Sequence, residues 1–162
     1  MTRREVVVEA LTESVARLDS VLVPWGFSFH FGGVHHSHTG QYASGFYSRD
    51  LTRISLSCRD EIDNLYYEQS FVKNSLCSRE TEKFTIGHNT LMRGLGHADD
   101  CRLLVVDEVP TALVARDGGD PVAALIYDLT NFAEPVLGRA GEDFDAIFRQ
   151  GFRSYSIEPP TS

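Results

Sequence analysis

The stretch Arg53-Ile54-Ser55-Leu56-Ser57-Cys58-Arg59 alternates strictly between apolar and polar side chains. Successive side chains of a β-strand point to opposite faces, so Ile54, Leu56 and Cys58 share one face. The pattern predicts a strand over about residues 52–59 with this apolar face against the core and the arginines on the opposite face. A register shifted by one residue would bury both arginines without evident partners, which would cost several kcal/mol.

The neighbouring segments predict three more strands around this one. The residues Phe27, Phe29 and Phe31 alternate with polar or small residues, which indicates a strand with its phenylalanines buried. A loop is expected over 32–40, followed by strands over about 41–49 and 64–72. Because the connections are short, consecutive strands should pair antiparallel as a four-stranded meander.

Helical patterns flank this sheet on both sides. A capping-box spacing at Thr2 and Glu5 opens a helix over 3–22, which Pro24 and Gly26 stop. After the strands we expect helices in the segment following Glu82, from Asp120-Pro121 to about Pro135, and over 142–150. Periodicity leaves residues 102–106 open between a strand and a helical turn, and residues 98–118 without an assigned structure.

The order of helix, strands and helices predicts a single α+β domain over residues 1–162, with helices on one face of the sheet. Residues 157–162 are expected to form a flexible tail. No stretch has the composition of a signal peptide or a membrane span. The three cysteines form no Cys-x-x-Cys pair, and their odd number argues against a disulfide framework. A cytoplasmic location is the expectation.

The chain carries 15 basic and 23 acidic residues, for a formal net charge of −8. An acidic protein repels phosphate backbones and anionic membrane surfaces, so we expect neither nucleic acid nor membrane as a partner. A basic protein partner is favoured by the same charge.

One histidine cluster is a candidate metal site. It consists of His35, His36 and His38 in the glycine-flanked segment 32–40. Imidazole is a common ligand for divalent transition metals. The spacing matches no recognised metal motif, however, and a solvated polar loop is the alternative. A metal-binding protein or metal-dependent enzyme using these histidines therefore stays open beside the expectation of no cofactor.

No catalytic motif is evident in the sequence. Nucleophile-elbow, phosphate-loop and dinucleotide-binding patterns are all missing. The remaining candidate is the polar face of the sheet, since tyrosine and arginine are enriched in binding hot spots. We expect a protein partner or a second copy of the chain to contact Arg53, Arg59 and Tyr66, with Tyr47 and Arg49 on the same face.

The stretch Leu18-Asp19-Ser20-Val21-Leu22-Val23-Pro24-Trp25-Gly26-Phe27-Ser28-Phe29 resembles the opening of small uncharacterised bacterial α+β proteins, some of the toxin-immunity type. The segment Ala123-Ala124-Leu125-Ile126-Tyr127-Asp128-Leu129 adds to this resemblance. The resemblance implies a bacterial cytosolic protein that binds and neutralises another protein, and it brings no catalytic residues. A non-enzymatic, immunity-like inhibitor is therefore the first functional expectation, and a housekeeping or interaction domain is a further alternative.

Overall fold

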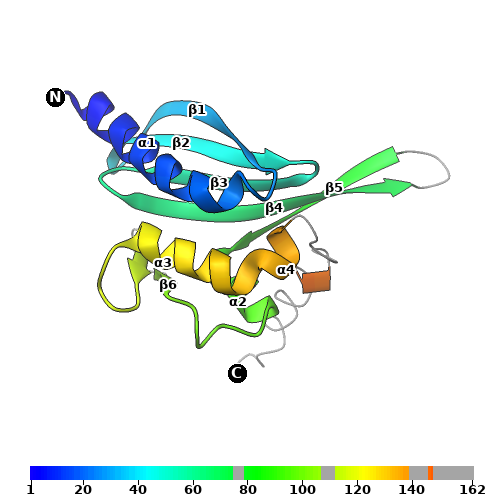
Figure 1. Cartoon of the computed structure of the whole chain (residues 1–162). Coiled ribbons are helices and arrows are strands. Elements are labelled where there is room, and N and C mark those ends of the chain that lie inside the picture. Colours follow the sequence, from blue (N-terminus) through cyan, green and yellow to red (C-terminus); the bar gives the residue numbers. More distant parts are fainter. Residues whose placement is uncertain (75–78, 107–111, 139–145, 148–162) are drawn as a thin grey trace, which may run out of the picture.

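The computed structural model describes residues 1–74, 79–106, 112–138 and 146–147. A long helix comes first, a sheet follows, and short helices and a hairpin come last, which confirms the predicted α+β class (Figure 1). In chain order the elements are α1 (Arg3–Leu22), β1 (Ser28–Ser37), β2 (Gly40–Arg49), β3 (Thr52–Cys58), β4 (Ile62–Asn74), β5 (Arg79–Gly87), α2 (His88–Gly94), β6 (Leu103–Val106), β7 (Ala112–Ala115), α3 (Pro121–Asp128), η1 (Leu129–Ala133) and α4 (Glu134–Leu137).

Helix α1 forms as its capping box predicts. The Thr2 hydroxyl accepts the Glu5 backbone N–H at 3.2 Å, and the Glu5 carboxylate accepts the Thr2 N–H at 3.0 Å. Two of the unpaired N–H groups at the helix start are satisfied in this way. The helix contacts β1 to β4 with one buried stripe, which consists of Val7, Leu11, Ser14, Leu18 and Leu22.

The sheet is an antiparallel meander in the order β1-β2-β3-β4-β5, with five strands where the sequence predicted four. The missed strand is β5, which occupies part of the segment predicted as helix after Glu82. Strand β4 is thirteen residues long, and β5 pairs with it from Tyr66 to Asn74. This pairing provides hydrogen-bond partners for the backbone N–H and C=O groups on that edge of β4. The helix therefore begins only at His88.

Strand β1 also differs from its prediction. It continues to Ser37 through the segment expected to be a loop, because a bulge between Phe31 and Gly33 lets the pairing with β2 resume. The predicted burial of all three phenylalanines is wrong at one position. Phe27 is buried and Phe29 is half-buried, but the Phe31 side chain, next to the bulge, is 56% exposed.

The last part of the described chain caps the core. Strands β6 and β7 pair as a hairpin, which settles residues 102–106 as strand. Helix α3 starts as predicted, with the Asp120 carboxylate accepting the Val122 N–H at 2.9 Å. The predicted end at Pro135 is wrong: a π-helical turn follows α3, and Pro135 lies in the first turn of α4, where its missing N–H is not needed.

The predicted helix over 142–150 and the predicted tail over 157–162 lie outside the described residues, except for residues 146–147, which are helical. None of the helices in the described ranges combines the length and apolar character needed to cross a bilayer.

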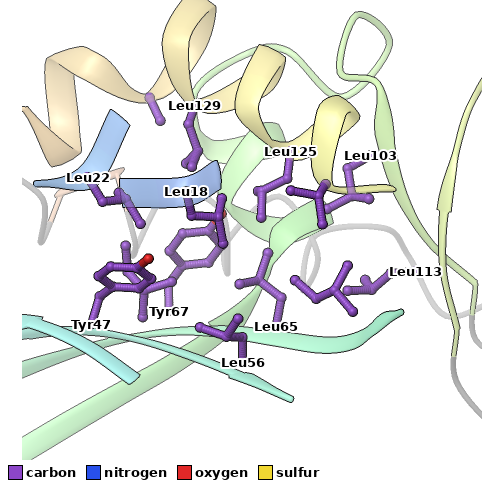
Figure 2. Packing of buried hydrophobic residues seen from close by; sticks show 14 of the residues in the cluster. Leu18, Leu22, Tyr47, Leu56, Leu65, Tyr67, Leu103, Leu113, Leu125 and Leu129 are labelled. Atoms are coloured by element: carbon purple, nitrogen blue, oxygen red, sulfur yellow. The ribbon is translucent and has the colours of Figure 1, made fainter. Parts of the chain in front are cut away.

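The buried apolar residues form one cluster between the sheet and the elements stacked on it. Figure 2 shows side chains from α1, the sheet, the β6–β7 hairpin and α3 meeting in this layer. Among them are Leu18, Leu22, Tyr47, Leu56, Leu65, Tyr67, Leu103, Leu113, Leu125 and Leu129. We call the sheet face that contacts this layer the inner face and the opposite one the outer face.

Candidate functional site

The outer face of the sheet follows the predicted alternation along β3. Ile54 and Leu56 are buried on the inner face at 2% and 3% exposure, whereas Arg53 is exposed. On β4 the same alternation buries Tyr67 and leaves Tyr66 42% exposed beside its cross-strand partner Ser55. The prediction that Arg53 and Tyr66 occupy the face opposite the helices is confirmed.

Tyr47 and Arg49 do not lie on this face, so that part of the prediction is wrong. Tyr47 pairs with Ile54 on the inner face and is completely buried. Its hydroxyl donates to the Asp19 carboxylate at 2.8 Å and lies 3.1 Å from the Val15 carbonyl oxygen. Burial, with a further contribution from Asp19, raises the pKa of Tyr47 far above its ordinary value.

Arg49 is a structural connector. Its guanidinium donates to the backbone carbonyls of Trp25 at 2.7 Å and Leu137 at 2.6 Å, and it lies 4.5 Å from the centroid of the Phe27 ring. These contacts join β2 to the α1–β1 connection and to the end of α4. Arg49 lies on the inner face because the two-residue turn at Asp50 and Leu51 pairs it with Thr52. Thr52 is two positions from Ile54 and therefore shares its face.

A shallow groove crosses the outer face, with a volume of about 290 Å³. It runs across the strands between two groups of rings. Phe46 and Tyr66 lie on one side, and His35 and Tyr42 lie on the other. Small and polar residues form the floor between them, namely Gly32, Ser44, Ser57 and Asn64. We refer to this feature as the transverse groove.

The two arginines beside the transverse groove differ in how their hydrogen-bond donors are used. Arg59 donates to the Asp63 carboxylate at 2.8 Å, to the Ser37 hydroxyl at 3.0 Å and to the Thr39 hydroxyl. Arg53 has a different environment: its guanidinium carbon lies 3.9 Å from the centroid of the Phe46 ring. Within the described residues Arg53 makes no hydrogen bond and no ion pair.

The three histidines of the candidate metal site do not converge. His35 and His36 are consecutive residues of β1, so their side chains point to opposite sides of the strand. The His35 ring lies 2.9 Å from the Ser44 hydroxyl, the His36 ring lies 3.4 Å from the Gln41 amide, and His38 is in the β1–β2 turn. The histidine hypothesis is therefore corrected, because it assumed a loop that could wrap an ion. No group of three potential metal ligands is gathered anywhere in the described ranges.

A buried polar cluster, which sequence reasoning missed, lies on the inner side. The Tyr67 hydroxyl is 2.8 Å from His88 Nδ1, and His88 Nε2 is 2.8 Å from Asp128 Oδ2. Asp128 also accepts the backbone N–H groups of Arg102 at 2.6 Å and Leu103 at 2.9 Å. Burial, together with nearby Asp128, raises the pKa of Tyr67 well above its ordinary value.

This Tyr67–His88–Asp128 cluster resembles a proton-relay arrangement, but all three side chains are completely inaccessible to solvent. A substrate cannot touch any of them in this conformation. The cluster instead links β4, α2 and α3 to the start of β6, so its role is structural. The only sequence feature that could have suggested it is the pair of polar residues, His88 and Asp128, on otherwise apolar helix faces.

Comparison of the chain with models of known protein families, with curated proteins and with solved structures found no match.

Proposed function

We propose that this chain is a protein-binding domain and that the outer face of its sheet is the docking surface. The observation that carries the proposal is a sheet face with Tyr66 and Arg53 exposed, beside a groove lined with rings. Aromatic residues and arginine dominate the binding energy of protein interfaces. Arg59 at the edge of the same face completes the set of contact residues that we assign.

A toxin inhibitor of the immunity type is the specific form of this proposal that the net charge favours. A charge of −8 attracts a basic protein over long range and raises the rate of encounter. This form predicts that the association rate with a basic toxin falls steeply as salt rises, because screening shortens the range of the attraction. A rate that does not change between low and physiological salt would contradict it.

Site-specific photo-crosslinking tests the docking surface. A photoreactive phenylalanine analogue replaces Tyr66 on the outer face and, as the matched control, Glu9 on the exposed side of α1. Both variants are expressed in the organism from which the chain comes and irradiated in the cell. We expect one defined adduct from position 66, because that side chain lies at the centre of the proposed interface.

The control position must give no adduct with the same protein. Adducts of the same protein at equal yield from positions 66 and 9, or an adduct only from position 9, would place the interface elsewhere. A band at twice the mass of the chain from position 66 would identify the partner as a second copy, which the proposal includes.

A further inference from the structure

The transverse groove has an ordered cross-strand construction. Successive rows of residues across the sheet lie two positions apart along each strand. One row contains His30, Phe46, Ser55 and Tyr66, and the next contains Gly33, Ser44, Ser57 and Asn64. Tyr42 belongs to the third row, opposite His35. Large side chains therefore flank a central row of small ones, and the groove runs perpendicular to the strands.

These rows set the size of an occupant. From β1 to β4 the groove crosses three strand spacings, which amount to about 14 Å, the length of about four extended residues. The Cα atoms of Tyr42 and Phe46 are four residues apart on one strand, or about 13 Å. The volume of 290 Å³ is at the lower limit for small-molecule pockets. A short extended segment with one ring inserted between the walls matches these dimensions.

Several polar groups in the groove have no hydrogen-bond partner among the described residues. They are the hydroxyls of Tyr42, Ser55 and Tyr66 and the side-chain amide of Asn64. Three of the four can donate through O–H, and the fourth through N–H. None of the described residues that line the groove is an aspartate or a glutamate, although the chain as a whole carries a net charge of −8. The Asp63 carboxylate accepts the hydroxyl of the floor residue Ser57 at 2.7 Å, but it is also ion-paired with Arg59 at 2.8 Å. The free donors of the lining therefore accommodate an acceptor-rich group.

Arg53 adds a preoriented cation next to the Phe46 wall, outside the lining of the groove itself. Contact with the Phe46 ring holds the guanidinium, and His30 stacks against the same ring with centroids 5.0 Å apart. A guanidinium has five N–H donors in its plane, and in Arg53 none of them has an acceptor among the residues that the structure describes. Its cross-strand neighbour Glu68 is ion-paired with Lys83 at 3.4 Å. Such a group suits a planar carboxylate, which accepts two parallel hydrogen bonds.

We propose that the transverse groove binds a short extended segment of the partner protein that presents an aromatic side chain beside a carboxylate. The ring lies between the walls formed by Tyr42 and by Phe46 and Tyr66, and the carboxylate accepts from Arg53. This inference rests on the proposed docking function and adds the chemistry of the contacted segment. A carboxylate can occur at the contact even in a basic partner. The net charge of the partner governs the association rate, whereas individual ion pairs determine the specificity of the bound complex.

The test uses N-acetyl-L-phenylalanine as the probe, with N-acetyl-L-phenylalaninamide as its uncharged match. Both are titrated into the ¹⁵N-labelled full chain and followed by amide chemical shifts. For probes of this size we expect a dissociation constant on the order of 1 mM. The acid should shift the amides of Ser44, Ser55 and Ser57 and should bind about 5-fold or more tightly than the amide, because only the acid pairs with Arg53.

Two variants with the same change in charge isolate the role of Arg53. Arg53→Gln should remove the preference for the acid, whereas Arg4→Gln, on the exposed side of α1, should retain it. The amide spectra also report whether each variant is folded. Retention of the full acid preference in Arg53→Gln would overturn the assignment of the carboxylate to this guanidinium.

The outcomes separate this inference from the proposed function. Equal binding of acid and amide in the groove of the natural chain would overturn the carboxylate contact and would leave the docking surface standing. Failure of the acid to shift the groove amides at 20-fold above the expected dissociation constant would overturn the inference completely. The photo-crosslinks from position 66 would then decide the docking function by themselves.

Discussion

Removing the Asp128 carboxylate should destabilise the fold more than any change on the outer face. In Asp128→Ala the backbone N–H groups of Arg102 and Leu103 and one ring nitrogen of His88 lose their partner. Each buried polar group left unsatisfied costs about 1–3 kcal/mol. Three such groups sum to about 3–9 kcal/mol in the free energy of unfolding. Because the Arg102 N–H is only partly buried, we expect the lower part of this range, about 3–5 kcal/mol, which is a large fraction of the roughly 5–15 kcal/mol typical of a domain.

Urea unfolding followed by far-UV circular dichroism measures this loss. With a slope of about 2 kcal/mol per molar urea for a chain of this size, the midpoint should fall by about 2 M. Asp128→Asn keeps one acceptor oxygen and should lie between the natural chain and Asp128→Ala, which covers the case in which the alanine variant does not fold. The control is Asp100→Ala, whose side chain is 64% exposed and should matter by less than about 0.5 kcal/mol. A loss below about 1 kcal/mol in Asp128→Ala would refute the structural role of the cluster.

Two further changes test the packing and the protonation of the core. A Cβ at Gly45 would lie 2.3 Å from the Phe29 ring, so Gly45→Ala should lower the free energy of unfolding, measured in urea, by about 1–3 kcal/mol. Gly87→Ala is the control: its Cβ would lie in open space, and the loss should be about 1 kcal/mol or less. Burial raises the pKa of Cys58 to about 12. In a Cys77→Ser background a thiol reagent at pH 8 should therefore leave Cys58 unlabelled until urea unfolds the chain, with peptide mass spectrometry distinguishing Cys58 from Cys101. Fast labelling of Cys58 in the native protein would contradict this. Because only the unfolded state then releases this proton, Cys58 by itself should lower stability above about pH 9 by up to about 1.4 kcal/mol per pH unit. The raised pKa values of Tyr47 and Tyr67 add to this fall above about pH 10, and a flat profile to pH 11 would refute the assignment.

The parts of the fold that sequence predicts are those in which local pattern and tertiary packing agree. The capping box at Thr2 and the N-cap at Asp120 specify helix starts that the structure retains. The segment after Glu82 shows the opposite case. Its spacing of Phe84 and His88 is compatible with a helix, but hydrogen bonds to β4 hold the segment up to Gly87 as the strand β5. Hydrogen bonding between segments distant in the chain cannot be predicted from the periodicity of apolar residues within one segment.

The buried cluster was beyond prediction for a related reason. Tyr67, His88 and Asp128 lie on three different elements, and their hydrogen bonds depend on how β4, α2 and α3 pack. A histidine and an aspartate on apolar helix faces indicate that each needs a partner, but spacing along the chain does not identify it. The loop expected around the three histidines was wrong for the same reason, since the pairing of β1 with β2 resumes after the bulge and extends to Ser37.

The composition of the outer face, by contrast, follows from a single short-range feature that does lie in the sequence. The strands β2 and β3 are joined by two residues, and Asp50 has a φ of 51°, as tight hairpin turns require. A two-residue turn places Arg49 opposite Thr52 and therefore Tyr47 opposite Ile54. Once Ile54 is assigned to the core, Tyr47 must share its face and Phe46 must take the other. The same register places Tyr47 on the inner face and the Phe46 ring in contact with the Arg53 guanidinium. In the proposed complex, this contact orients the guanidinium toward a carboxylate.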